Sequence, residues 1–232
     1  MEVKSSIMIS KDCMNRILSL RNHFPKLDEK GGILLPLDLK IRDIDFMKYR
    51  HLPVNWDIEA VRNDDLPVEF SPDSVKLVDI FRRKTIDLDY EVMLIFDYKI
   101  AELIYCFVNN NGESNQILGS VDDDILIERN IATIHNHPKG YASPPSAENF
   151  QILELEFEEY ELVSSYDSLW ILESKSLISE EDIYEIKNNI KELYDFSISE
   201  NISNHDEVYG NLLMEYTNNS PFEIKLARRN LR

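Results

Sequence analysis

Two histidines separated by one residue, His135 and His137, stand at the end of the apolar run "NIATIHN". On a β-strand, residues two positions apart point to the same face, so both imidazoles can reach a single ion. Imidazole nitrogens bind zinc at about 2.0–2.1 Å. A catalytic zinc site also needs a third protein ligand, an open position for water and a carboxylate that accepts the proton of that water. The spacing suits a single ion bound by both imidazoles, and the alternative is two ordinary strand histidines.

The two remaining parts of such a site can be sought in neighbouring segments. The proline-rich loop "PKGYASPP" follows His137 and leads into "SAEN", whose Ser146 is a suitable helix N-cap. The first turn of that helix could supply the third ligand. Glu91, at the head of the apolar run "EVMLIFD", is the leading candidate for the base, and Glu102 in "AELIYCF" is its competitor.

The stretch "HNHPKGYASPPSAEN" resembles the H-x-H-P…P-S-x-x-D signature of the JAB/MPN (JAMM) metalloprotease superfamily, including its RadC-like and phage head-morphogenesis branches. The resemblance covers residues 74–175. It implies a JAB/MPN core of the cytidine-deaminase-like type, with one zinc ion held by the histidines and an acidic residue. It also implies Glu91 as general acid and base, and Ser146 as a hydroxyl that stabilises the oxyanion. The implied reaction is cleavage of a peptide or isopeptide bond, and the implied partner is a protein substrate or ubiquitin-like modifier.

The position of the acidic ligand departs from this signature. Asn149 stands three residues after Ser146, where the signature has aspartate. Counting along the loop from His137 places Glu148 there instead. Residues three apart share one face of a helical turn, which favours Asn149, whereas a carboxylate attracts a divalent cation more strongly than an amide, which favours Glu148. We assign Asn149 together with the two histidines as the predicted ligands, and Glu148 remains the alternative.

The missing aspartate motivates a second hypothesis, in which the chain is a catalytically impaired MPN-like scaffold or binding module. The letters "HNH" also occur in a class of nucleases. Such a nuclease needs a ββα-metal unit and a basic face for DNA, and the sequence indicates neither.

Composition narrows the classes of function further. The 232 residues are 43% hydrophobic, and 43 acidic against 25 basic residues give a formal charge of -18, which argues against nucleic-acid binding. The basic clusters "FRRK" at 81–84 and "KLARRNLR" at the C-terminus are interpreted as a solvated helix end and a frayed tail. Cys13 and Cys106 form no C-x-x-C pattern, and no apolar run reaches the length of a membrane span. We therefore expect a cytoplasmic protein with reduced thiols.

Periodicity and breaker residues predict the elements that position the site. Residues 1–73 are rich in proline and form a predicted N-terminal extension, with a short helix at 12–20. Residues 74–175 form the predicted JAB/MPN-like domain, and residues 176–232 a C-terminal helical segment that packs on the core. The order of helices and strands predicts an α+β fold, in which helices flank a mixed β-sheet.

Within the central domain, the sequence predicts a helix that begins at an N-cap, Ser74, and a second helix over 147–160 with a row of exposed glutamates. The predicted strands lie at 90–98, 101–108, 130–136, 160–165 and 168–174. The glutamates assigned to the exposed helix face are Glu154, Glu156, Glu158 and Glu159.

Overall fold

The computed structural model describes residues 43–109, 126, 129–139, 143–154, 158–174, 178–199 and 204–231, with the backbone alone for 43–44 and 151–154. The helices are α2 (Asp43–His51), η1 (Asn63–Asp65), α3 (Pro72–Thr85), η2 (Ala147–Glu154), α5 (Glu180–Ser199) and α6 (His205–Asn218). The strands are β1 (Val92–Asp97), β2 (Glu102–Val108), β3 (Ile131–Asn136), β4 (Glu158–Ser164), β5 (Ser168–Ser174) and β6 (Ile224–Asn230).

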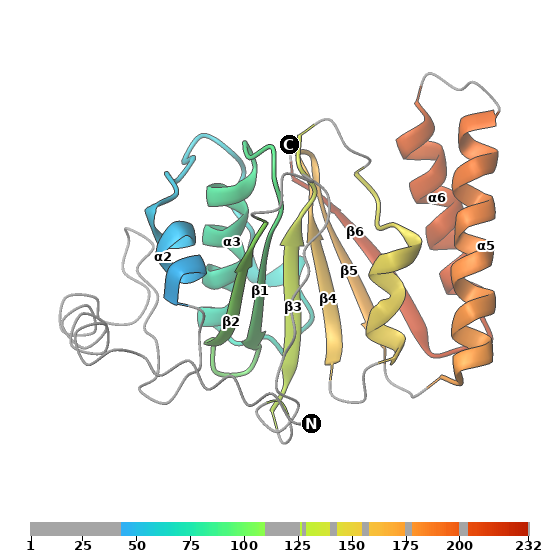
Figure 1. Cartoon of the computed structure of the whole chain (residues 1–232), viewed down its shortest axis with the longest axis horizontal. Coiled ribbons are helices and arrows are strands. Elements are labelled where there is room, and N and C mark those ends of the chain that lie inside the picture. The colour runs from blue at the N-terminus through green and yellow to red at the C-terminus, as the bar shows by residue number, and fades with distance from the viewer. Residues whose placement is uncertain are drawn as a thin grey trace, which may run out of the picture.

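The strands form one mixed sheet in the order β2-β1-β3-β4-β5-β6, with β3 and β4 at its centre (Figure 1). Only β3 and β4 run parallel, and every other neighbouring pair is antiparallel. A parallel pair needs a crossover connection, which η2 and its flanking loops provide between β3 and β4. The α+β class with a mixed sheet, predicted from the sequence, is therefore confirmed.

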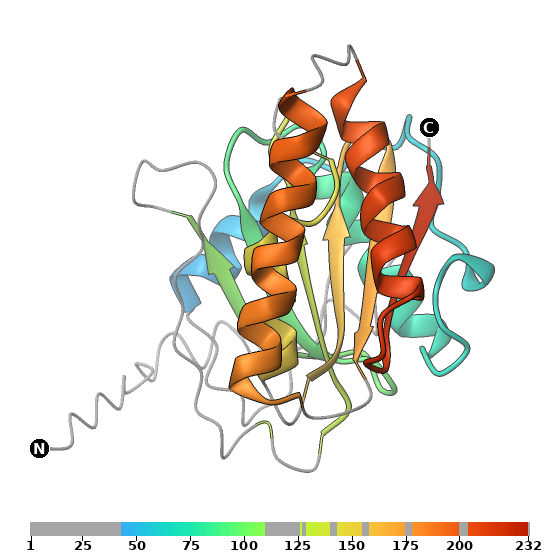
Figure 2. The ribbon, with the colours of Figure 1, turned by 90° about the vertical axis from the view of Figure 1, so that its right-hand side faces the viewer.

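Helices cover both faces of the sheet and make three layers. The α2 and α3 helices lie against one face, and η2, α5 and α6 lie against the other, where α5 and α6 cross in front of the strands (Figure 2). Alternate residues of a strand point to opposite faces, so each central strand contributes to both hydrophobic layers. On β5, Leu169 and Ile171 belong to the core beneath α3, while Trp170 and Leu172 belong to the core beneath α5 and α6.

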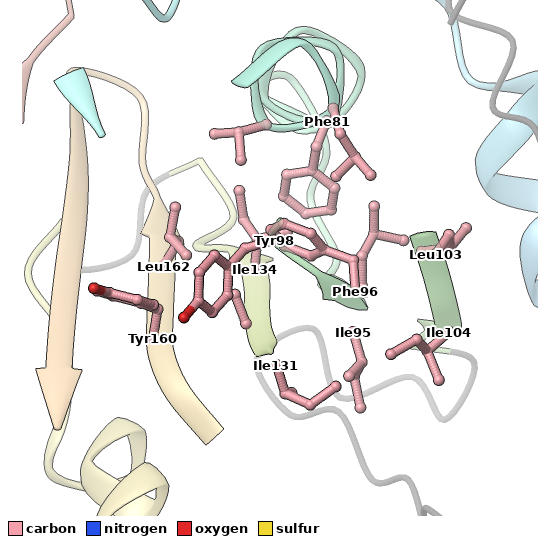
Figure 3. Close-up of a cluster of buried hydrophobic side chains, with 14 of the residues drawn as sticks. Phe81, Ile95, Phe96, Tyr98, Leu103, Ile104, Ile131, Ile134, Tyr160 and Leu162 are labelled. Carbon is pink, nitrogen blue, oxygen red and sulfur yellow. The ribbon is translucent and has the colours of Figure 1, made fainter. Parts of the chain in front are cut away.

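The larger core lies between α3 and the sheet. Phe81 of α3 is fully buried and points toward Phe96 and Ile134 of the central strands (Figure 3). In the same view, Ile95 and Ile131 point away from α3, toward the face that also carries the histidines. Burying side chains of this size stabilises a fold by about 1.5–3 kcal/mol each.

The basic cluster at residues 81–84 is buried, which corrects its interpretation as a solvated helix end. The guanidinium of Arg82 donates to the carbonyl oxygens of Glu59, Tyr166 and Leu231 at 3.0, 3.3 and 2.6 Å. Lys84 donates to the carbonyl oxygens at the end of α2, of which Arg50 is nearest at 2.8 Å. These cations are buried because main-chain carbonyl groups replace their water.

Three other local predictions are wrong. The helix predicted from Ser74 begins earlier: Ser71 is its cap and accepts a hydrogen bond from the Ser74 backbone N–H at 3.1 Å. The predicted helix over 147–160 ends at Glu154, and Glu158 is a buried strand residue, not an exposed helix residue. The C-terminal tail is not frayed, because residues 224–230 pair with β5 as an edge strand. In the last two cases strand pairing with distant residues overrides the local pattern.

The described part of the N-terminal segment, residues 43–71, packs on the same core as the sheet. Phe46 and Tyr49 of α2, and Phe70 before α3, are buried in the layer beneath α3. The predicted helix at 12–20 and Cys13 lie outside the described residues. Cys106 is a free thiol buried on β2. Among the helices of the described residues, none is long and apolar enough to cross a membrane.

Candidate metal centre

The two histidines lie at the end of β3 and share one face of the sheet. Their ring centroids are 5.3 Å apart, with 46° between the ring planes. His135 is only 3% exposed, and His137, just beyond the strand, is half-buried. Burial and the neighbouring imidazole of His137 hold the pKa of His135 well below its usual range, so its ring is neutral at pH 7. A neutral imidazole is the form that binds a metal ion.

Glu91 immediately precedes β1, which pairs with the histidine strand β3. The antiparallel register sets Met93 opposite His135, and Glu91 lies two residues before Met93, beyond the paired residues. Asn136 fixes this approach, since its side chain accepts from the Val92 N–H at 2.7 Å and donates to the Tyr90 carbonyl at 3.0 Å. The backbone on both sides of Glu91 is thus tied to the histidine strand.

The carboxyl group of Glu91 is buried, with 8% of the residue exposed. Burial raises its pKa to about 7, because removal from water disfavours the charged form. A carboxyl group with that pKa can both accept and release a proton near neutral pH. Glu102, the other candidate for the base, lies on β2 and pairs with Asp97 at the far end of β1. Its carboxylate forms a salt bridge with Arg129 at 2.8 Å. Of the two candidates, Glu91 is the one whose adjacent backbone is hydrogen-bonded to Asn136, the residue between the two histidines.

Asn149 lies against His135 from the first turn of η2. Its Oδ1 accepts hydrogen bonds from the Ser146 backbone N–H at 2.7 Å and from the Ser146 hydroxyl at 3.1 Å. Because a backbone N–H can only donate, these bonds orient the amide oxygen toward Ser146. The amide nitrogen then faces His135 Nε2 at 3.0 Å and Glu161 Oε1 at 3.3 Å. His135 Nε2 must accept from this NH2 group, which places the ring proton on Nδ1.

Glu148, the alternative to Asn149, points elsewhere. Its side chain is 72% exposed, and its carboxylate lies 3.4 Å from the Lys191 ammonium of α5. The side chain that the structure brings to the histidines at this turn is therefore the amide. Asn149, the position that the first-turn spacing favoured, contacts His135, and Glu148, the position that charge favoured, contacts Lys191 instead.

Glu161 of β4 is a buried carboxyl group at this site that the sequence reasoning missed. Its Oε1 lies 3.4 Å from His135 Nδ1, and that nitrogen has no hydrogen-bond partner. Burial, followed by the charge of Glu158, raises the pKa of Glu161 well above its usual range. Only the parallel pairing of β3 with β4 brings Glu161 here, and the one local signal is an acidic residue inside the apolar run "YELVS".

These residues meet part of what a zinc site requires. The tautomer imposed on His135 leaves Nε2 with a lone pair directed out of the ring, which suits a metal ion. Asn149 in its present orientation offers an NH2 group, which cannot coordinate. Within the residues that the structure describes, no group of three or more His, Cys, Asp or Glu side chains could hold a metal ion. For zinc to bind at His135 Nε2, the Asn149 NH2 group would have to leave that nitrogen.

A cavity of about 270 Å³ opens beside the pair, and His137 is the only predicted site residue that lines it. Its far wall is held by hydrogen bonds from the Ser143 hydroxyl to Asp167 at 3.0 Å and from Arg228 to Ser168 at 2.9 Å. His135 and Asn149 are not among the residues that line the cavity. Other lining residues include Lys139, Tyr166, Trp170, Asp206 and Glu207.

The buried carboxyl group of Glu158, which accepts a hydrogen bond from Thr133, makes stability depend on pH. Burial raises its pKa from 4.5 to about 7. A raised folded-state pKa favours folding below pH 4.5, and this advantage is lost as the pH rises through about 7. We expect Glu158→Gln to gain stability over the wild type across this range, by up to about 3 kcal/mol at pH 8.

Urea unfolding at pH 4.5 and pH 8 measures this difference. Glu185→Gln, which removes an exposed carboxylate from α5, serves as the control and should change stability by less than about 0.5 kcal/mol at both values. An equal change in the free energy of unfolding of Glu158→Gln at both pH values would contradict the raised pKa of the buried Glu158 carboxyl group.

Comparison with known proteins found no match: no protein family, no curated protein and no solved structure corresponds to this chain.

Proposed function

We propose that the chain is a JAB/MPN-like metallohydrolase that cleaves a peptide or isopeptide bond, with zinc bound by His135 and His137. In this proposal Glu91 is the general acid and base, and a protein bearing a ubiquitin-like modifier is the substrate. The proposal is supported by two neighbouring histidine rings at the end of β3 and by Glu91, a buried carboxyl group whose adjacent backbone is hydrogen-bonded to Asn136 of the same strand.

The roles of the residues follow from their positions. Zinc, when bound, would polarise the scissile carbonyl group and increase the acidity of water. Glu91 would accept a proton from the attacking water and deliver it to the leaving amine, so that one carboxyl group serves both steps. Ser146 is exposed, and its hydroxyl, which donates to Asn149 Oδ1 in this structure, would have to turn from that oxygen to donate to the carbonyl oxygen of the substrate.

The experiment is hydrolysis of isopeptide-linked and linear peptide substrates by the zinc-loaded full chain. We expect Glu91→Gln to lower the rate by at least about 100-fold while zinc stays bound, because the variant removes the proton acceptor only. Glu102→Gln is the matched control and should keep the wild-type rate, since Glu102 pairs with Arg129 away from the histidines. Equal rates for Glu91→Gln and the wild type would refute the assigned role.

A second candidate function, a non-catalytic MPN-like binding or assembly module, is favoured by one observation. The Asn149 amide presents its NH2 group to His135 Nε2, so the nitrogen that would bind the metal is already satisfied by a protein donor. In such a module this bond would have only a structural role. A wild-type chain that takes up no zinc at micromolar free concentration would favour this alternative.

A further inference from the structure

The C-terminal strand β6 lies at one edge of the sheet and pairs with β5 on one side (Figure 2). Its seven residues match those of β5 one to one in antiparallel register. The ladder continues at Leu231, whose backbone N–H donates to the Asp167 carbonyl oxygen at 2.9 Å. Because successive residues of a strand direct their backbone groups to opposite sides, every second residue before Leu231 also faces β5. The residues between them face away from the sheet.

Leu226, Arg228 and Asn230 are the residues whose backbone groups face outward. Within the part of the chain that the structure describes, no backbone hydrogen bond joins these three residues to a segment other than β5. The N-terminal segment reaches β6 through the Arg229 side chain, which donates to the Asp65 carbonyl oxygen at 3.1 Å. Unpaired N–H and C=O groups along a sheet edge can accept a further strand. The outer edge of β6 is therefore open to strand addition.

The side chains along this edge carry positive charge in a protein whose formal charge is -18. Lys225 and Arg229 are exposed and share one face of the sheet, with the half-buried Ala227 between them. The Lys225 ammonium lies 4.0 Å from the Glu173 carboxylate, and Arg229 donates to a carbonyl group and not to an acid. Both cations can therefore pair with carboxylates of a partner.

We propose that β6 binds an extended acidic segment of a partner protein, which adds to the sheet as an antiparallel strand. Lys225, Ala227 and Arg229 would then occupy the positions of the new ladder that are not hydrogen-bonded, where facing side chains come closest. A matching segment carries acidic residues four positions apart, with an apolar residue midway between them. The inference is independent of the proposed function, because it involves none of the residues assigned to the metal centre.

A second copy of the chain fits this edge less well. In the register that pairs all of β6 with another β6, Lys225 faces Arg229 of the other copy, and like charges directly opposite destabilise a sheet. The same cations oppose pairing with uncharged strands, as charged edges do in many sheets. An acidic segment replaces this repulsion with attraction. At 0.15 M salt charges act over about 8 Å, so the facing cations outweigh the distant acidic residues of the chain.

The test uses the full chain and a fluorescein-labelled peptide with blocked ends, Thr-Glu-Thr-Val-Thr-Glu-Thr, followed by fluorescence anisotropy at about 0.15 M salt. We expect saturable binding that the double variant Lys225→Glu/Arg229→Glu weakens by at least about 10-fold. Lys76→Glu/Lys191→Glu is the matched control, because it changes the net charge equally at two exposed lysines of α3 and α5. The control should keep the affinity within about 2-fold of the wild type.

A modified peptide distinguishes strand pairing from simple charge attraction without altering the protein. N-methylation of two consecutive central residues keeps every charge but removes an N–H from each edge of the peptide strand. We expect the methylated peptide to bind at least about 10-fold more weakly.

Equal binding of the two peptides would overturn the proposal, and so would binding that is unchanged in Lys225→Glu/Arg229→Glu. The absence of saturable binding below about 1 mM peptide would also overturn it. A peptide-free chain that sediments as a dimer, and that dissociates when the peptide is added, would assign this edge to a second copy instead.

Discussion

Replacing Asn149 by aspartate is expected to tighten zinc binding by about 10- to 100-fold, as one added charge near the ion is equivalent to roughly 1.4–3 kcal/mol. In the wild type the Ser146 backbone N–H holds the Asn149 oxygen at 2.7 Å and leaves the NH2 group toward His135. Aspartate avoids this conflict because both of its δ atoms are acceptors. One oxygen can keep the bond to Ser146 while the other takes the place of Nδ2 and meets the ion.

Chelator competition at pH 7 measures this gain. Glu148→Gln is the control that distinguishes Asn149 from Glu148 as the third ligand. Its carboxylate faces Lys191 and is exposed, so we expect zinc affinity to stay within about 2-fold of the wild type. A large loss of zinc in Glu148→Gln, or no gain in Asn149→Asp, would contradict the geometry of the first turn of η2.

Replacing Arg82 by leucine is expected to lower the free energy of unfolding by about 3 kcal/mol or more. The guanidinium is 1% exposed and satisfies carbonyl groups from three distant segments, at Glu59, Tyr166 and Leu231. Leucine removes the donor and leaves these carbonyl groups with fewer hydrogen-bond partners in a buried site. The loss of one buried charge offsets only part of this cost.

Guanidinium-induced unfolding at pH 7, followed by circular dichroism, measures the difference. Arg229→Leu is the control, because that side chain is exposed and donates to one carbonyl group, that of Asp65. We expect the control to lose less than about 1 kcal/mol. Similar losses in both variants would mean that Arg82 does not join the N-terminal segment, the β4–β5 turn and the C-terminal strand.

Local periodicity predicted most of the sheet. The apolar runs that became β1, β2, β3 and β5 were identified from hydrophobic pattern and turn residues, as was α5 with its capping Ser179, whose Oγ accepts from the Asp182 N–H at 3.2 Å. The errors occurred where a distant partner decides the structure. Residues 224–230 were interpreted as a basic tail because the local sequence does not reveal their pairing with β5. Arg82 was interpreted as a surface residue because the carbonyl groups that it contacts come from distant segments.

In the candidate site, too, residues close in sequence were easier to predict than residues that long-range pairing brings together. His135, His137 and Asn149 could be proposed from the sequence because they lie within one strand, one loop and one helical turn. Glu91 could be proposed only with the aid of the family resemblance, since its approach depends on the β1–β3 register. Glu161 was missed because nothing local distinguishes it from other strand glutamates, and only the crossover to β4 places it beside the histidine ring.

The most direct test of the central claim, that His135 and His137 form a metal centre, is the zinc content of the full chain purified without a metal-affinity tag. Inductively coupled plasma mass spectrometry would compare the wild type with His137→Ala. The account predicts about one zinc per wild-type chain and almost none in the variant. Equal zinc in both proteins, or none in the wild type, would contradict it.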